Sequence, residues 1–174
     1  MKRLLLLRHA KTVPGGPGTD DHARKLTARG REDAPAIGRY MKKHKLEPDL
    51  ICSSTSRRTV ETVELVTEAL KTRPDTEYLT ALYLAEPETI IAIIQSAPLK
   101  AQSLCIVGHN PGMEHAASIL AREPVKPKER DYFDAIEEKF PTAALAVFDF
   151  DIAHWHDIAP GEGMLVDFVR PRDL

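Results

Sequence analysis

The sequence predicts an α/β protein, a three-layer α/β/α sandwich around a mostly parallel central sheet. Short apolar runs typical of strands alternate along the chain with longer segments that have a helical pattern. The first run, from Arg3 to Leu7, is apolar without interruption after its first residue, which is typical of a central strand covered on both faces. The run from Leu104 to Val107 has the same character and predicts a second buried strand.

The predicted elements follow in a regular order. Six segments are expected to be strands: about Arg3 to Arg8, Asp49 to Cys52, Glu77 to Leu79, Ser103 to Val107, Leu145 to Phe150 and Met164 to Val169. Five are expected to be helices: Thr27 as cap to about Lys43, Ser56 to Lys71, Pro87 to Gln95, Met113 to Ala121 and Asp131 to Lys139. The proline- and glycine-rich segment 14–18 and the charged segment 123–131 are expected to be loops.

Length and composition fit one domain spanning residues 1–174. A chain of this size can bury about 70% of the surface that it exposes when unfolded. Its 24 basic and 26 acidic residues give a net charge of −2. That balance argues against a general binder of nucleic acid or of anionic membranes, so any attraction for an anion must come from a local site.

The sequence predicts a cytoplasmic protein. No apolar stretch approaches the roughly 20 residues of a membrane-spanning helix. Arg8 ends the first apolar run too early for a signal peptide. Cys52 and Cys105 both fall in predicted buried strands, where they are expected to be reduced core residues and not a disulfide.

Three segments place reactive groups where strands end. Arg8 and His9 directly follow the first strand, and His109 follows the strand that ends at Val107. In open α/β sheets, ligands bind beyond the carboxyl ends of the strands. The third segment, 54–62, begins a helix that has Arg58 in its first turn, and a helix N-terminus favours anions. These groups predict an anion site, with phosphate as the expected anion.

The same residues resemble the histidine phosphatase superfamily, also called phosphoglycerate-mutase-like, and within it the small SixA-like protein phosphohistidine phosphatases. The pairing of Arg8-His9-Ala10 with a Gly-His-Asn-Pro-Gly segment about 100 residues later is the most specific part of the resemblance. The matching segments run in order along nearly the whole chain: 7–11, 21–30, 54–62, 108–112, 140–144 and 165–171. The resemblance implies a phosphatase with the phosphoglycerate-mutase-like fold.

The chemistry of these groups predicts a metal-independent phosphatase that works through a covalent phosphohistidine intermediate. A neutral His9 would attack the phosphoryl group, and water would then hydrolyse the adduct. Arg8, Arg58 and a cationic His109 would bind and stabilise the phosphoryl oxygens, with the Asn110 N–H as a neutral donor. No metal or cofactor is expected. Because His109 would benefit from a proton, activity is expected to peak near or below neutrality.

Two arginines compete for one of these roles. The family pattern places its arginine four residues after a serine and four before a threonine. Ser54, Arg58 and Thr62 satisfy both spacings, whereas Arg57 is followed four residues later by Glu61. The pattern therefore favours Arg58 and predicts an exposed Arg57–Glu61 pair.

The general acid is not identified by the sequence. Glu86 and Tyr83 are both candidates, and Glu86 is equally well explained as a charge at a helix N-terminus. The absence of an acid suits a phosphoramidate, because imidazole leaves more readily than an alkoxide. The expected partner is therefore a phosphohistidine-bearing protein, as the SixA-like resemblance implies, while the oligomeric state stays open.

Three other functions stay open. A phosphatase for a small phosphomonoester would use the same groups, and a non-catalytic phosphate- or phosphohistidine-binding module would need only the arginines. A mutase would need a donor acid and a tight substrate cage, which the sequence does not indicate. Asp21, Arg24 and Leu26 match the family's loop before the first helix and are expected to anchor that loop and form the pocket rim.

Overall fold

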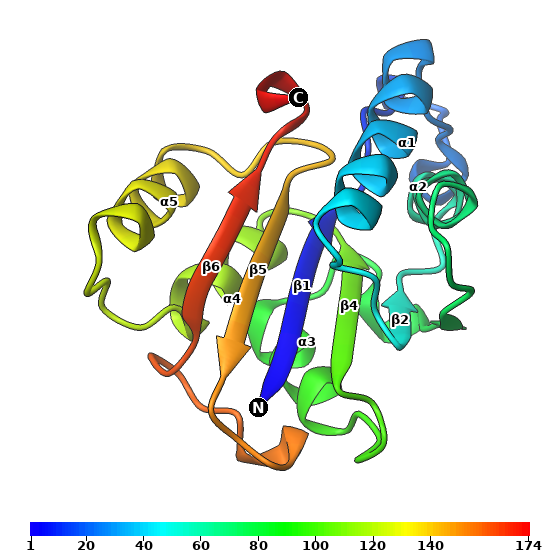
Figure 1. Ribbon diagram of the computed structural model, residues 1–174. Helices are drawn as coiled ribbons and strands as arrows, with labels where there is room; N and C mark the ends of the chain where they lie inside the picture. Colours follow the sequence, from blue (N-terminus) through cyan, green and yellow to red (C-terminus); the bar gives the residue numbers. More distant parts are fainter.

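The computed structural model describes residues 1–174 and consists of one six-stranded sheet with helices on both faces (Figure 1). The strand order is β3-β2-β4-β1-β5-β6. The strands are β1 (Lys2–Arg8), β2 (Leu50–Ser53), β3 (Asp75–Tyr78), β4 (Ser103–Gly108), β5 (Leu145–Phe150) and β6 (Met164–Val169). All neighbouring pairs from β3 to β1 are parallel, and only β5 runs against its two neighbours. The predicted α/β architecture with a mostly parallel sheet is confirmed.

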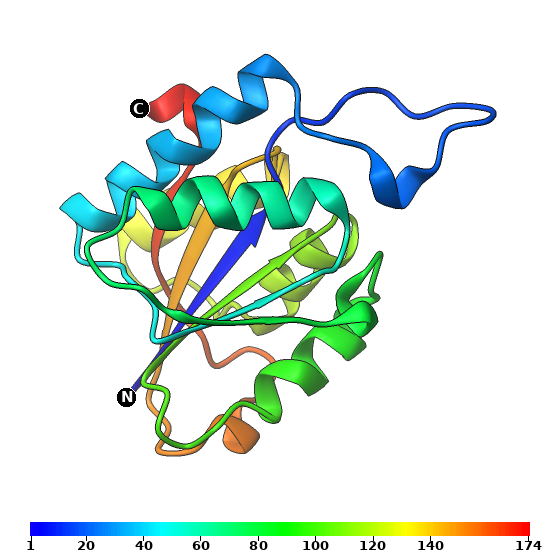
Figure 2. The ribbon, with the colours of Figure 1, turned by 90° about the vertical axis from the view of Figure 1, so that its right-hand side faces the viewer.

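Five helices form the outer layers, as Figure 2 shows from the side. They are α1 (Ala28–Lys43), α2 (Arg57–Glu68), α3 (Pro87–Gln95), α4 (Gly112–Leu120) and α5 (Pro127–Glu138). Three single turns of 3-10 helix lie in the connections: η1 (Asp21–Ala23), η2 (Thr80–Leu82) and η3 (Trp155–Asp157). A fourth, η4 (Pro171–Asp173), follows β6. None of the helices combines the length and the apolar character that a crossing of a membrane requires.

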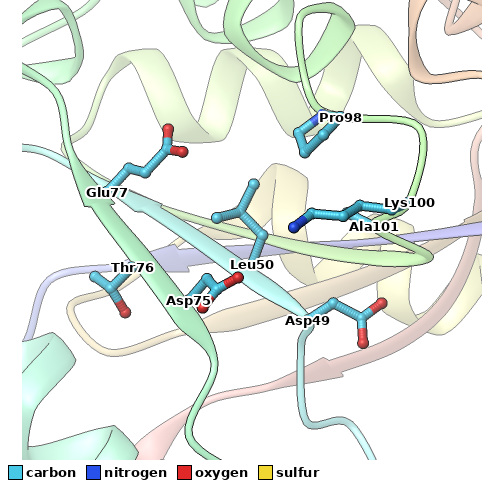
Figure 3. A pocket seen from close by; sticks show the side chains of 8 residues that line it. All are labelled: Asp49, Leu50, Asp75, Thr76, Glu77, Pro98, Lys100 and Ala101. Atoms are coloured by element: carbon cyan, nitrogen blue, oxygen red, sulfur yellow. The ribbon is translucent and has the colours of Figure 1, made fainter.

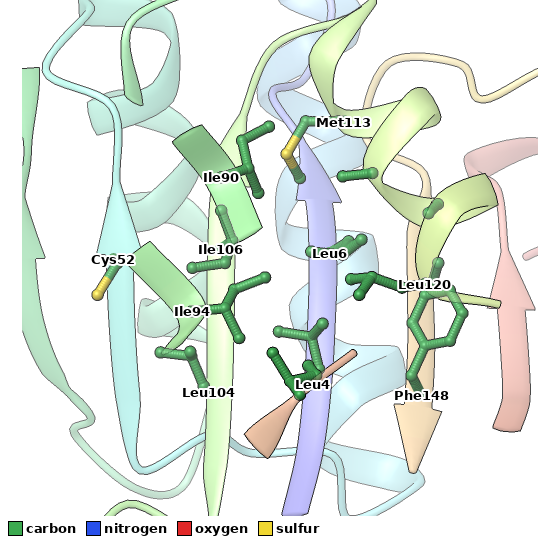
Figure 4. Close-up of a cluster of buried hydrophobic side chains, with 14 of the residues drawn as sticks. Leu4, Leu6, Cys52, Ile90, Ile94, Leu104, Ile106, Met113, Leu120 and Phe148 are labelled. Carbon is green, nitrogen blue, oxygen red and sulfur yellow. The ribbon is translucent and has the colours of Figure 1, made fainter. Parts of the chain in front are cut away.

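The alternation of side chains along β1 divides the core into two clusters. Leu5 and Leu7 face α1 and α2, whereas Leu4 and Leu6 belong to the larger cluster under α3 and α4 (Figure 4). All four leucines are essentially fully buried, as expected of a central strand with both faces covered. Helices therefore pack on both faces of the sheet, so the carboxyl ends of its strands are held in fixed positions.

Three elements have boundaries that differ by two or more residues from the sequence-based prediction. One is α2, which ends at Glu68 instead of about Lys71. α5 begins at Pro127, four residues earlier than expected, so most of the predicted loop 123–131 is helical. Proline is favoured in a first helical turn, and the buried Glu129 there receives hydrogen bonds from Arg122 and the Val125 N–H. β3 lies at Asp75–Tyr78 instead of Glu77 to Leu79, because its pairing with β2 and not its own apolar pattern defines it.

The first turn of α1 is tied to the loop after β1. Thr27 caps the helix as predicted, with its Oγ1 accepting the Gly30 N–H at 3.1 Å. A Cβ atom on Gly30 would lie 2.2 Å from the Lys11 carbonyl oxygen, so only glycine permits this close approach. The start of α1 therefore braces the segment that follows His9.

Candidate active site

Strand register brings the two predicted histidines together. β1 and β4 are parallel neighbours, and Arg8 pairs with Gly108. The residues that follow, His9 and His109, therefore leave adjacent strands at the same level, and their ring centroids lie 5.3 Å apart. Both side chains are buried. Two histidines 100 positions apart in sequence thus share one site at the carboxyl edge of the sheet.

His9 is held in one orientation by backbone and side-chain contacts. Its Nδ1 lies 2.8 Å from the Ala10 carbonyl oxygen, which makes Nδ1 the protonated nitrogen and leaves the lone pair on Nε2. The Ala10 N–H in turn donates to Thr62 Oγ1 at 3.0 Å. Burial lowers the pKa of His9 to about 3, and the nearby charges of Arg8 and Arg58 act in the same direction. His9 is therefore neutral at physiological pH, the state in which its imidazole is nucleophilic.

Ser54, Arg58 and Thr62 lie four residues apart in and just before α2, on one face of the segment. Each of the three is buried, and the Arg58 side chain is only 4% exposed. The neighbouring Arg57 side chain is 55% exposed, and its Nε donates to Glu61 Oε1 at 3.0 Å. The helix therefore turns Arg58 toward the two histidines and Arg57 away from them, with the Arg57–Glu61 pair that the spacing predicted.

Arg58 already has an anionic partner within the chain. Its Nη1 donates to the Asp21 carbonyl oxygen at 2.8 Å and its Nη2 to Asp21 Oδ2 at 3.2 Å. The Tyr83 hydroxyl also donates to Oδ2, and Arg24 Nη1 donates to Oδ1 at 2.7 Å. These donors hold the pKa of the Asp21 carboxyl well below its usual range. The sequence placed Asp21 in the loop at the rim but gave no sign of this contact with Arg58.

His109 is buried and lies beside Ser54. Its Nε2 lies 2.8 Å from Ser54 Oγ, while its Nδ1 is buried without a hydrogen-bond partner. Burial lowers the pKa of His109 to about 3, and the charge of Arg58 acts in the same direction. In the free protein His109 is therefore neutral, and the cationic form expected beside the phosphoryl group requires that His109 gain a proton when that group binds. With a proton on Nδ1 it can still donate a hydrogen bond to an oxygen in the site.

Arg8 and Asn110 both donate to the backbone carbonyl of Phe140, which lies in the segment between α5 and β5. Arg8 Nη1 donates to the Phe140 oxygen at 3.1 Å, and Asn110 Nδ2 donates to the same oxygen at 2.8 Å. Arg8 Nε is buried without a partner, and the Asn110 backbone N–H makes no hydrogen bond. The segment 140–144 thus positions both residues. Its resemblance to the family was visible in the sequence, but this bracing role was not.

The two candidate acids occupy different environments. Glu86 is exposed at the N-cap of α3 and makes no capping hydrogen bond with its side chain. Tyr83 lies inside the site, edge-on to the His109 ring with centroids 5.5 Å apart. Its hydroxyl proton is engaged by Asp21, and burial together with that contact raises the pKa of Tyr83. Neither residue stands as a free proton donor in this structure.

The site is built for an anion. Two guanidinium groups, Arg8 and Arg58, lie close enough to lower the pKa of His9 and His109, and cations so placed would repel a metal ion. A hollow of about 520 Å³ lies at the opposite edge of the sheet, where β2 and β3 begin (Figure 3). Asp49, Asp75 and Glu77 line it with Lys100, and it contains no histidine. His9, His109, Arg8 and Arg58 all lie at the other edge of the sheet, where β1 and β4 end.

Comparisons with known proteins agree with this geometry. The family model of the histidine phosphatase superfamily (branch 1) matches residues 4–82. An uncharacterized protein of Mycobacterium tuberculosis strain H37Rv is 32% identical over 166 residues, which span 95% of this chain and 100% of that protein. A crystal structure from Agrobacterium tumefaciens, provisionally named phosphohistidine phosphatase SixA, is 32% identical with a TM-score of 0.80 and 98% coverage of both chains. A similarly named protein from Nakamurella multipartitia is 25% identical, with a TM-score of 0.82 over 98% of this chain and 96% of that one.

Proposed function

The chain belongs to the histidine phosphatase superfamily and is a SixA-like phosphatase, and we propose that it dephosphorylates phosphohistidine on a partner protein through a phosphohistidine intermediate on His9. The observation that carries this proposal is the state of His9. Its imidazole is neutral, its tautomer is set by the Ala10 carbonyl, and its Nε2 makes no hydrogen bond. A buried neutral imidazole beside two arginines suits attack on a bound phosphoryl group.

The reaction has two steps. The Nε2 lone pair of His9 forms a bond to phosphorus while the bond from phosphorus to the substrate's imidazole nitrogen breaks. The substrate ring carries a proton on its other nitrogen, so it takes the electrons of the broken bond and leaves as neutral imidazole. Water then attacks phosphorus, the bond to His9 breaks, and inorganic phosphate leaves with His9 neutral again. Arg8, Arg58 and the N–H of Asn110 would stabilise the charge on the phosphoryl oxygens in both steps.

His109 would act as a hydrogen-bond donor through Nδ1. The bound phosphoryl group brings negative charge beside this ring, which opposes the effect of burial and raises the pKa of His109 in the complex. A proton acquired on binding would then add a positive charge to the pocket.

We favour phosphohistidine over a phosphomonoester as the substrate because of the state of the carboxyl groups that could protonate a leaving group. Of the carboxylates near the pocket, Asp21 is held ionised by Arg58, Arg24 and Tyr83, and Glu114 accepts a hydrogen bond from Asn110 Nδ2 at 3.1 Å. Glu86 is exposed outside the site. An alkoxide leaving group needs a proton donor, whereas imidazole leaves more readily. The names of the relatives from Agrobacterium tumefaciens and Nakamurella multipartitia support the same substrate class. The cytoplasmic location expected from the sequence stays a prediction.

The test compares wild type with His9→Ala, in the presence of a chelator, on a phosphohistidine-bearing protein and on p-nitrophenyl phosphate. We expect fast turnover of phosphohistidine and weak turnover of the ester by wild type, and loss of both in the variant. Equal activity of the two proteins would exclude His9 as nucleophile. An ester turned over as fast as phosphohistidine would favour a small-molecule phosphatase, and loss of activity with chelator would exclude metal independence.

A further inference from the structure

The loop between β1 and α1 places a carboxylate on the arginine that the proposed reaction needs. Arg58 uses two of its guanidinium nitrogens to bind Asp21, one through the backbone carbonyl and one through the side chain. The Arg58 side chain is 4% exposed, so Asp21 supplies the counter-ion for a buried cation. A phosphoryl group bound by Arg58 would meet this carboxylate at the same guanidinium.

Resting on the proposed function, we propose that Asp21 is a specificity-determining residue that competes with the phosphoryl group for Arg58. A carboxylate and a phosphate dianion at one guanidinium repel each other. An anion that enters the site must therefore displace the Asp21 carboxylate from Arg58 or bind Arg58 more strongly than Asp21 does. Free phosphate brings no other contacts and therefore binds weakly. A phosphoryl group carried on a protein brings the contacts of that protein as well. The same competition favours release of inorganic phosphate after hydrolysis.

The loop is built so that this contact can be exchanged. At its base, Thr12 bridges to Leu26 and the Val13 N–H donates to the Lys25 carbonyl at 2.9 Å. Beyond that base the loop extends away from the body of the molecule (Figure 2), and η1 has no buried residue. Loss of the Asp21 contact with Arg58 would therefore leave the core untouched.

Asp21 is also held near Arg58 by hydrogen bonds that do not involve the Arg58 guanidinium. Tyr83 donates to Oδ2, and Arg24 donates to Oδ1 while its Nε donates to the Val13 carbonyl at 3.0 Å. His22, the next residue, is tethered through Nε2 to Thr55 Oγ1 at 2.9 Å. Asp21 that has released Arg58 would still be held at the pocket rim, ready to return when phosphate leaves.

The alternative to competition is that Asp21 has a purely structural role. If Asp21 serves only to orient Arg58 for binding, removal of the carboxylate charge would weaken phosphate binding. If Asp21 competes with phosphate, the same change would strengthen it. The two roles therefore predict changes of opposite sign in one measured affinity.

The experiment measures the affinity of the full chain for inorganic phosphate by calorimetry, without any turnover. Asp21→Asn keeps the size of the side chain and removes its charge. Asp20→Asn is the matched control, because Asp20 is exposed in the same loop and its side chain accepts a hydrogen bond only from the His22 N–H, at 3.1 Å. We expect Asp21→Asn to bind phosphate about tenfold or more tightly than wild type, and the control to stay within about twofold.

A second variant covers the case in which Asp21→Asn folds poorly. Tyr83→Phe removes one donor to Oδ2 and is expected to tighten phosphate binding in the same direction, by a smaller factor. Unchanged or weaker phosphate binding in the folded variants would overturn the proposal. The phosphohistidine assay of wild type is independent of this result, so tighter phosphate binding without any turnover would contradict the proposed function and leave the competition by Asp21 in place.

Discussion

Thr62 Oγ1 accepts a hydrogen bond from the Ala10 backbone N–H at 3.0 Å and itself donates to the Arg58 carbonyl at 2.7 Å. One hydroxyl thus connects the residue after His9 to the helix that carries Arg58. The family-like spacing of Thr62 four residues after Arg58 places it one helical turn further on, where this bridge can form. The relative positions of His9 and Arg58 depend on that contact.

The bridge can be tested with Thr62→Val, which keeps the shape of the side chain and leaves the buried Ala10 N–H without a partner. We expect a loss of about 1–3 kcal/mol in the free energy of unfolding and a clear fall in kcat, because His9 is no longer held in register. Thr67→Val is the control, since Thr67 bonds only carbonyls of its own helix. Denaturant titration and phosphohistidine turnover check both effects. Equal losses in the two variants would contradict the special role of Thr62.

Arg58 and Arg57 provide a matched pair of adjacent arginines. Arg58→Lys removes the planar, bidentate donor set and is expected to lower kcat/KM about a hundredfold, which corresponds to roughly 3 kcal/mol of transition-state stabilisation. Arg57→Lys alters only an exposed ion pair with Glu61, and its kcat/KM should stay within about twofold of wild type. Steady-state kinetics on a phosphohistidine substrate separates them. A larger loss in the Arg57 variant would reverse the assignment.

The two buried histidines predict a stability that falls in acid. The pKa of each is about 3 in the folded chain, against 6.5 for an ordinary histidine. The unfolded chain therefore takes up more protons as the pH falls below 6.5, and the folded state loses stability from there toward pH 3. At pH 5 the loss relative to pH 8 is about 2 kcal/mol for each histidine.

Urea titrations at pH 8 and pH 5 measure this loss. His9→Asn and His109→Asn should each remove part of the pH dependence, whereas His115→Asn, at an exposed position, should leave it unchanged. A wild-type stability that does not change between the two pH values would contradict the neutral, desolvated state of both rings.

The pH profile of kcat tests the state of His109 in the substrate complex. If the bound phosphoryl group raises the pKa of His109 enough for it to gain a proton, kcat should fall on the alkaline side as that proton is lost. His109→Gln cannot titrate and should give a lower kcat without this alkaline limb. Rapid-quench measurement of phosphohistidine loss from pH 5 to 9 reports both profiles. An alkaline limb of the same shape in the variant would assign it to another group.

The elements around the site differ in how far the sequence could predict them. The strand Lys2–Arg8 and the cap at Thr27 follow from local pattern, because apolar runs and capping hydroxyls act within a few residues. The start of α5 was missed because its charged first turn is stabilised by Arg122, outside the helix. β3 was displaced because its pairing with β2 defines it.

By itself, the sequence determined the kind of site: two histidines after strands, an arginine in a family-like helix and an α/β fold to carry them. Only the tertiary structure decided how these groups work together. Register between β1 and β4 brings His9 beside His109, and burial by the surrounding layers makes both rings neutral. The contact of Asp21 with Arg58 spans 37 positions and joins a loop to a helix. Such contacts depend on how the layers close around the site, which no local pattern along the chain encodes.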